Sequence, residues 1–209
     1  MKKKLYLVCA GDFGLESEFM LRQNKRFCEE YEIIGFIDDS LKSVDLSKSH
    51  LKILGTTDFE FTKDEFVLIT SSNPSVKQNI YNKLKNKVQF CNFISENVLL
   101  APNVTIGEGT IIFASSIISI NSIIGRFVTI NFSCRIGHDV VIKDFTSIMC
   151  NVDIGGHTRI GEKVFLGTST TIIQQRKIAD NIIVSAGGIV LRNLIKVGTY
   201  VGNPVQLIN

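Results

Sequence analysis

The sequence is poor in the residues that hold together several common classes of protein. Among its 209 residues there is no Trp, and there are only three Pro, three Met and three His. The five cysteines have neither CxxC spacing nor an even count, which argues against a disulfide framework and a thiolate zinc site. We therefore expect reduced thiols in a cytoplasmic protein.

Long apolar runs and a strong excess of charge are also missing. No stretch approaches the roughly 18–20 apolar residues that a membrane helix needs. The apolar run at residues 5–10 ends at Gly11, too early for the core of a signal peptide. A net charge of +3 is too small to indicate a nucleic-acid partner. The sequence predicts a protein that binds neither membrane nor nucleic acid.

The N-terminal part alternates short β-rich runs with helical ones. Residues 5–10, 33–37 and 66–70 are typical of buried strands, and a helix is expected from the turn at 11–14 to about residue 31. Val76, Ile80 and Leu84 give a second helix one apolar face. This order predicts a small parallel sheet covered by helices.

From residue 94 the apolar period changes to six. Every sixth position from 94 to 190 is Ile, Leu or Val without exception, and most positions four residues later are small or β-branched. A helix cannot keep a six-residue repeat on one face, whereas a solenoid of short strands joined by tight turns can. The Gly that follows many of these aliphatics is expected to leave room at the corners and to permit positive φ.

The repeats IGEGTI, IGRFVT, IGHDVV, IGGHTR and IGEKVF resemble the hexapeptide repeat of left-handed parallel β-helix acyltransferases. The whole chain, with its terminal VGNP, resembles bacterial sugar acetyltransferases grouped with sialic acid O-acetyltransferases and nucleotide-amino-sugar N-acetyltransferases. The resemblance implies an α/β, Rossmann-like sugar-nucleotide-binding domain at 1–92 and an all-β left-handed β-helix acyltransferase domain at 93–209. It also implies a homotrimer with acetyl-CoA, the acyl donor, in the groove between two subunits.

His138 and Asp139 are the candidate catalytic pair. In the six-residue register Ile136 points inward, which leaves these two side chains on the outer surface. An imidazole can take a proton from an attacking amine or hydroxyl, and a neighbouring carboxylate can hold its other nitrogen. In the resembled family a His followed by an acidic residue acts in this way; a solvated surface His is the alternative.

The resemblance also points to residues for acetyl-CoA. Nine residues after His138, where the family often has a second His, stands Ser147, which can donate a hydrogen bond but cannot act as a base near neutral pH. The backbone of three further residues is expected to face the pantetheine arm: Gly156, Thr168 and Ala186. Residues 174–178, QQRKI, interrupt the small-residue rule, which suggests a projecting loop whose Arg176 or Lys177 meets CoA phosphates or forms a solvated charge pair.

The first strand-to-helix turn resembles the family's glycine-rich turn for the nucleotide of a sugar substrate. The candidate substrate-binding residues follow the ends of the three predicted strands, where parallel sheets bind ligands: Gly11, Asp12, Phe13, Asp38, Asp39 and Asn73. Turn formation and helix capping explain these residue types equally well. Leu15 stands where nucleotide-amino-sugar enzymes often have a His, so the pattern is closer to the O-acetyltransferase branch.

His157 follows His138 by 19 residues, close to one coil of 18. Solenoid carbonic anhydrases collect three His around a metal, but here the third histidine, His50, lies in the other domain. Two histidines without a third ligand make a poor zinc site, so no metal is expected, and His157 is expected to be exposed to solvent or to lie near CoA.

The leading hypothesis is therefore an acetyl-CoA-dependent transferase acting on an amine or hydroxyl of a nucleotide-linked sugar of a bacterial surface glycan. A non-catalytic β-helix that binds a sugar nucleotide or scaffolds a partner is the alternative from another class. A third hypothesis keeps the enzyme but replaces acetyl by a longer acyl chain or an acyl carrier protein.

Overall fold

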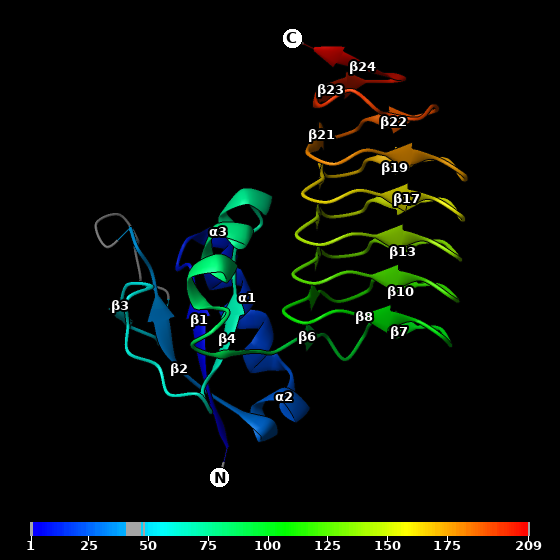
Figure 1. Cartoon of the computed structure of the whole chain (residues 1–209). Helices are drawn as coiled ribbons and strands as arrows, with labels where there is room; N and C mark the ends of the chain where they lie inside the picture. The colour runs from blue at the N-terminus through cyan, green and yellow to red at the C-terminus, as the bar shows by residue number, and fades with distance from the viewer. Residues whose placement is uncertain (1, 41–46, 48, 209) are drawn as a thin grey trace. The chain divides into compact units, whose positions relative to one another are not determined.

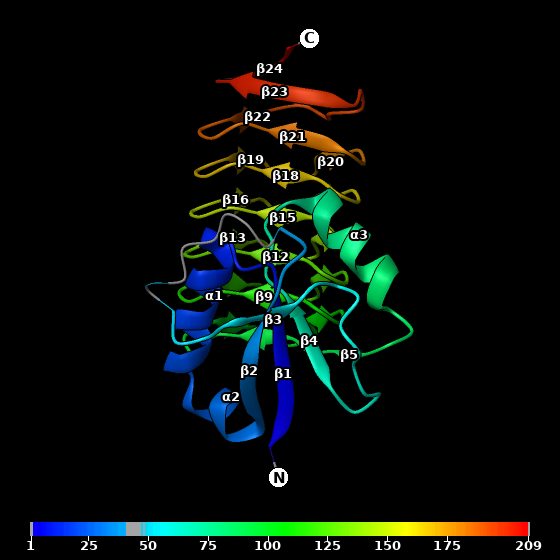
Figure 2. The same ribbon diagram turned by 90° about the vertical axis from the view of Figure 1, so that its left-hand side faces the viewer.

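The computed structural model describes residues 2–40, 47 and 49–208, and the chain divides into two compact units, Met1–Phe93 and Ile94–Asn209. The first unit contains a five-stranded sheet in the order β3-β2-β1-β4-β5, in which every pairing is parallel. Figure 2 shows β2, β1 and β4 side by side. The elements of this unit are β1 (Lys3–Val8), α1 (Asp12–Gln23), α2 (Lys25–Glu30), β2 (Tyr31–Ile37), β3 (Ile53–Gly55), β4 (Phe66–Ile69), α3 (Pro74–Leu84) and β5 (Gln89–Phe90). The predicted parallel sheet is confirmed, although β3 and β5 were not expected.

The single helix expected up to residue 31 is two helices. Asn24 interrupts it with extended backbone, and its side-chain oxygen accepts a hydrogen bond of 2.9 Å from the Phe27 amide. Asn is a favourable N-cap residue, so Asn24 ends α1 and starts α2 within a stretch whose pattern would otherwise continue one helix.

No helix in the described part of the chain is long and apolar enough to cross a membrane.

Gly14 lies in the first turn of α1, packed against the end of β1. A β carbon at this position would overlap the carbonyl oxygen of Cys9 and touch the ring of Phe36 at 3.4 Å. The glycine therefore allows the helix to start close to the carboxyl edge of the sheet.

Helix α3 begins at Pro74, and two residues of its predicted apolar face, Ile80 and Leu84, are buried. Asn73 caps it, accepting hydrogen bonds from the amides of Ser75 and Val76 at 3.0 and 3.2 Å. Val76, expected in the core, is 36% exposed, whereas Lys77 is 1% exposed and packs with Ile80 and Leu84. Burial lowers the pKa of Lys77 well below its usual value.

The second unit is a β-solenoid, whose coils stack in Figure 1 from β7 to β24. One sheet contains β6 (Phe93–Ile94), β9 (Ile111–Ile112), β12 (Thr129–Ile130), β15 (Ser147–Ile148), β18 (Phe165–Leu166), β21 (Ile182–Val184), β23 (Gly198–Gly202) and β24 (Val205–Ile208). A second contains β7 (Leu99–Leu100), β10 (Ile117–Ile118), β13 (Arg135–Ile136), β16 (Asp153–Ile154), β19 (Thr171–Ile172) and β22 (Ile189–Val190). The third contains β8 (Thr105–Ile106), β11 (Ile123–Ile124), β14 (Val141–Ile142), β17 (Arg159–Ile160) and β20 (Lys177–Ile178). In the coils before β23, neighbouring strands pair in parallel at an 18-residue spacing, as Ile136 does with Ile154. β23 pairs with β21 at a 16-residue spacing and antiparallel with β24.

The predicted column of aliphatic side chains forms the solenoid core. From Ile112 to Val190 each sixth residue is at most 2% exposed. Leu100, in the first coil, is 39% exposed. Stacking between coils therefore buries the interior, and the first coil lacks a neighbour in this unit on one side.

Positive φ occurs at the corners, but not at the expected glycines. It falls three residues after the inward aliphatic, for example at Asp139 (φ 55°) and His157 (φ 57°). The glycine directly after the aliphatic instead lets consecutive coils approach, because a β carbon on Gly137 would lie 2.7 Å from the amide nitrogen of Gly156. These corners place polar side chains in columns along the solenoid.

Candidate functional site

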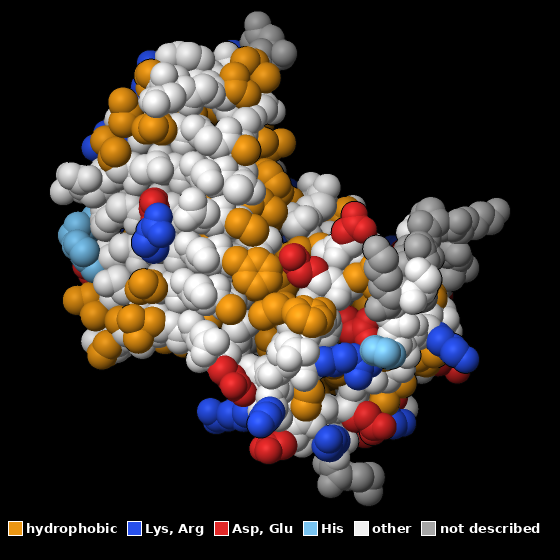
Figure 3. All heavy atoms as spheres, turned by 180° about the vertical axis from the view of Figure 1, so that it is seen from behind, with side chains coloured by type: hydrophobic (Ala, Val, Ile, Leu, Met, Phe, Trp, Pro, Cys, Tyr) orange, Lys and Arg blue, Asp and Glu red, His pale blue; other side chains and the backbone are white. Residues whose placement is uncertain are grey.

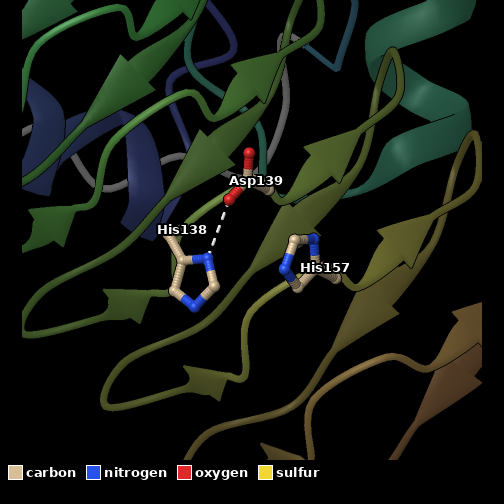
Figure 4. Close-up of side chains that lie close together, drawn as sticks. All are labelled: His138, Asp139 and His157. Atoms are coloured by element: carbon tan, nitrogen blue, oxygen red, sulfur yellow. Dashed lines mark hydrogen bonds and ion pairs between the residues drawn. The ribbon is translucent and has the colours of Figure 1, made fainter.

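His138 and Asp139 form one corner between β13 and β14. Their side chains are 52% and 36% exposed, which confirms their predicted place on the outer surface. The Nδ1 atom of His138 lies 2.8 Å from Oδ2 of Asp139 (Figure 4). When the carboxylate is ionised Nδ1 must be the donor, so the basic lone pair of the neutral ring is on Nε2.

A column of side chains from earlier coils supports Asp139. Asn103 donates to Asn121 at 3.3 Å, and Asn121 donates to Oδ1 of Asp139 at 3.3 Å. Hydrogen bonds from His138 and then from Asn121 lower the pKa of Asp139 below its usual value. The carboxylate therefore stays charged at neutral pH and fixes the orientation of the imidazole.

His157 continues this column in the next coil. Its amide donates to the carbonyl oxygen of His138 at 2.9 Å, and the two imidazoles meet edge to face with ring centroids 4.8 Å apart. Figure 4 shows both rings beside Asp139 on the same corner. The 19-residue spacing was the sequence signal for this contact, and the expected exposure of His157 to solvent is confirmed.

Gly156 lies directly beneath the imidazole of His138. A β carbon on residue 156 would lie 2.6 Å from Nε2 and 2.9 Å from Cε1 of that ring. Gly156 was predicted to face acetyl-CoA; the structure adds that its lack of a side chain gives His138 its place.

The other predicted acetyl-CoA residues do not meet His138 within one chain. Ser147 lies on β15 in the eight-stranded sheet, and its buried Oγ has no hydrogen-bond partner among the described residues. Thr168 and Ala186 are exposed on consecutive coils at a different corner, between β18 and β19 and between β21 and β22. These assignments remain predictions.

The loop expected at residues 174–178 is absent from the solenoid, since β20 continues the regular coil there. Arg176 turns back toward its own backbone, with Nε donating to the Gln174 carbonyl at 3.1 Å. The backbone therefore keeps the register of the coil although the large Arg176 stands where a small or β-branched residue was expected. Lys177 instead lies with Lys143 and Arg159 along a cavity of about 430 Å³ on the third sheet.

The N-terminal unit has a cavity of about 650 Å³ at the carboxyl edge of its sheet. Of the predicted substrate residues, Gly11, Asp38 and Asp39 line it. Three others are not among its lining residues: Asp12 and Phe13, which lie in the first turn of α1, and Asn73, which caps α3. The sequence thus predicted the correct edge of the sheet, but only three of the six predicted residues line the cavity.

Asp38 shapes this cavity through its own hydrogen bonds. Its oxygens accept from the amide of Ala10 at 2.6 Å and from the amide and hydroxyl of Ser40 at 2.7 and 2.6 Å. Burial raises the pKa of Asp38, but these hydrogen bonds outweigh burial and leave the pKa below its usual value.

Asp39 connects β2 to α3. Its oxygens accept from the Thr57 amide at 2.7 Å and from Lys83 Nζ at 2.8 Å. Burial raises its pKa, and the bonds from Lys83 and Thr57 bring it below the usual value. Sequence reasoning missed Lys83, although Val76, Asn79, Ile80 and Lys83 line the cavity at the i, i+3, i+4 and i+7 positions of one helix face.

Comparisons of the sequence with known proteins find relatives that are named acyltransferases. No family model matches the chain. GDP-perosamine N-acetyltransferase of Escherichia coli O157:H7 is 26% identical over 170 residues, covering 79% of this chain and 76% of that protein. UDP-3-O-acylglucosamine N-acyltransferase of Bordetella pertussis is 29% identical over 109 residues, 52% of this chain and only 28% of that protein.

Several solved structures match the chain along its length. WeeI from Acinetobacter baumannii AYE has a TM-score of 0.88 at 26% identity, covering 99% of this chain and 100% of that one. The acetyltransferase domain of PglB from Neisseria gonorrhoeae FA1090, in complex with acetyl coenzyme A, has a TM-score of 0.87 at 22% identity and full coverage of both chains. These matches confirm the β-helix and the predicted resemblance to hexapeptide-repeat sugar acetyltransferases.

Proposed function

From its resemblance to hexapeptide-repeat β-helix sugar acetyltransferases, we propose that this chain transfers an acetyl group from acetyl-CoA to an amine or hydroxyl of a nucleotide-linked sugar. The product would enter a bacterial surface glycan, and the reaction would take place in the cytoplasm. The observation that carries the proposal is the exposed corner on which Asp139 holds Nδ1 of His138 at 2.8 Å. That arrangement leaves Nε2 of a neutral imidazole as a general base.

In the proposed reaction Nε2 of His138 takes the proton of the acceptor amine or hydroxyl as the acceptor attacks the thioester carbonyl. The carbon–sulfur bond breaks, and the departing CoA thiolate receives the proton. Asp139 stabilises the imidazolium that forms between these two transfers, as a carboxylate paired to the other ring nitrogen can. Ser147, Gly156, Thr168 and Ala186 are the proposed contacts to acetyl-CoA.

The N-terminal unit is the proposed binding site for the acceptor, as a Rossmann-like sugar-nucleotide-binding domain. The described residues that line its cavity include carboxylates, hydroxyls and the Lys83 ammonium, which suit the hydroxyls and phosphates of a sugar nucleotide. The Lys83 side chain is 55% exposed and its Nζ lies 2.8 Å from Oδ2 of Asp39, so the ammonium can reach an anionic ligand. GDP-perosamine N-acetyltransferase is among the relatives, so GDP-sugars are the first acceptors to test.

A homotrimer would complete the site. His138 and the pair Thr168 and Ala186 lie on different corners of the solenoid, so one subunit's base and another's acetyl-CoA contacts can share a groove. Exposed aliphatic side chains on the coils before His138 support contact with a second copy: Leu99, Ile117, Ile120 and Ile123. Figure 3 shows hydrophobic side chains gathered beside the histidines of the solenoid.

The decisive experiment is release of free thiol from acetyl-CoA in the presence of an acceptor. The variant His138→Ala should lower turnover at least about a hundredfold, as loss of a general base does. His50→Ala, which removes the exposed histidine of the other unit, is the matched control and should behave like wild type. Near-normal turnover of His138→Ala would remove His138 from the mechanism.

Two binding measurements define the ligands. Calorimetry that detects no acetyl-CoA binding at millimolar concentration would favour the alternative of a non-catalytic scaffold. Thermal shifts with UDP-, dTDP-, GDP- and CMP-sugars, compared between wild type and Lys83→Ala, would identify the acceptor. A shift with one sugar nucleotide that Lys83→Ala abolishes is the expected result.

A further inference from the structure

The corner that carries His138 and Asp139 holds a third potential metal ligand. The two imidazoles and the Asp139 carboxylate each offer one ligand atom, and these atoms all lie within 4.8 Å of one another. The edge-to-face contact of the rings and the short His138–Asp139 hydrogen bond keep the three groups together. The expectation of no metal rested on the distant third histidine and did not count this carboxylate.

The backbone brings the three side chains together independently of any ion. Asp139 and His157 occupy equivalent corner positions on consecutive coils, with φ of 55° and 57°. The hydrogen bond from the His157 amide to the His138 carbonyl fixes their separation along the solenoid. All three side chains are exposed or half-buried, so small rotations can bring the donors to one point.

The donor set selects a class of cation. Imidazole nitrogen with one carboxylate oxygen suits Zn²⁺ and its neighbours Co²⁺, Ni²⁺ and Cu²⁺, whereas Mg²⁺ and Ca²⁺ prefer sites made of oxygen alone. Zinc binds such ligands at about 2.0–2.2 Å and is stable with three protein ligands and water in the fourth position. The solvent-facing corner leaves that fourth position open.

We propose that His138, Asp139 and His157 bind one Zn²⁺ ion reversibly, with water completing the coordination. Binding replaces the hydrogen bond between His138 and Asp139 by two bonds to the ion. It therefore removes the arrangement that makes Nε2 of His138 a base. This consequence for catalysis, inhibition by zinc, rests on the proposed function, whereas the binding itself does not.

The test titrates the full-length chain at neutral pH with ZnCl₂ by calorimetry and with CoCl₂ by visible absorption. We expect one ion per chain and bands of a four-coordinate Co²⁺ site. His157→Asn should weaken binding at least about tenfold, since even loss of groups outside the coordination sphere has such effects. His50→Asn, which changes the remaining histidine, is the control and should bind like wild type.

Several results would overturn the proposal. They are no binding by wild type, equal binding by His157→Asn, loss of binding in His50→Asn, and a thiolate charge-transfer band, which would assign the ion to cysteine. Turnover with and without Zn²⁺ is then compared within each variant. Zinc should inhibit wild type, and a chelator should restore it, while the ratio in His157→Asn should stay near one. Near-normal turnover of His138→Ala would remove His138 from the proposed mechanism, and with it the expected inhibition by zinc, but would leave the titration result standing.

Discussion

Gly156 and the imidazole of His138 lie so close on consecutive coils that a β carbon on residue 156 would stand 2.6 Å from Nε2. Neighbouring backbone holds the glycine in place, so the ring would have to move. The position of the proposed base thus depends on a residue that carries no reactive group.

The first prediction follows from this contact. Gly156→Ala should displace the His138 ring and lower turnover at least about tenfold, because a small misplacement of a catalytic group can cost up to about a hundredfold. Thermal unfolding should change little, since the corner is exposed. The same substitution made in His138→Ala should cost nothing further, and an equal loss in both backgrounds would show that the effect does not pass through His138.

The second prediction concerns Asp139. Asp139→Asn keeps the shape of the side chain but removes the charge that stabilises an imidazolium and selects the ring tautomer. Turnover should fall at least about tenfold at neutral pH, a modest part of what this change can cost in comparable pairs. Asp144→Asn, which alters an ion pair with Arg126 elsewhere on the solenoid, is the control. Equal turnover in the two variants would contradict a role for Asp139.

The third prediction tests the solenoid core. Ile148 is 0% exposed in the interior column, whereas Ile195 is 61% exposed. Ile148→Ala should lower the free energy of unfolding by about 2–5 kcal/mol because it leaves a cavity, and Ile195→Ala should cost less than about 1 kcal/mol. Urea denaturation followed by circular dichroism measures both. Similar losses would mean that the six-residue register does not determine the core.

The fourth prediction is a pH dependence in the N-terminal unit. The pKa of Asp38 is lowered in the folded chain, so its contribution to stability is present above the unfolded pKa of about 3.9 and is lost as pH falls through the lower folded value. Asp38→Ala should therefore destabilise the unit at neutral pH by about 1–3 kcal/mol, the cost of leaving the buried Ala10 amide unsatisfied. Denaturant unfolding at neutral and acid pH should show the gap narrowing below about pH 4. A gap that stays constant into acid would contradict this role.

The solenoid could be predicted because every coil repeats the same pattern, an inward-pointing aliphatic residue at every sixth position. It also predicted the exposure of His138 and Asp139, since the same register sets which positions point outward. Contacts along the solenoid were harder to foresee. His157 meets His138 because it follows after one 18-residue coil plus one residue. The six-residue pattern shows which positions point outward, but it does not show which side chains of consecutive coils are in contact.

The N-terminal unit was less predictable because competing local preferences decide its details. Asn24 ended a helix that hydrophobic spacing alone would continue, as its side chain caps the next one. Val76, expected in the core, lines the cavity, whereas the charged Lys77 next to it is buried. Helical periodicity fixes a face only to within about one residue, since each residue turns the helix by about 100°.

The corner residues Asn103, Asn121, Asp139 and His157 occupy equivalent positions on four consecutive coils and are therefore evenly spaced along the solenoid axis. Each step along it moves a side chain by one strand spacing, about 4.8 Å. Transfer of the His–Asp pair to residues 120–121 or 156–157 would move the reactive nitrogen along the axis by one such step. The distance from this nitrogen to either end of the solenoid can therefore change only in steps of one coil. Moving the pair by whole coils would set how far along the axis the reactive nitrogen lies.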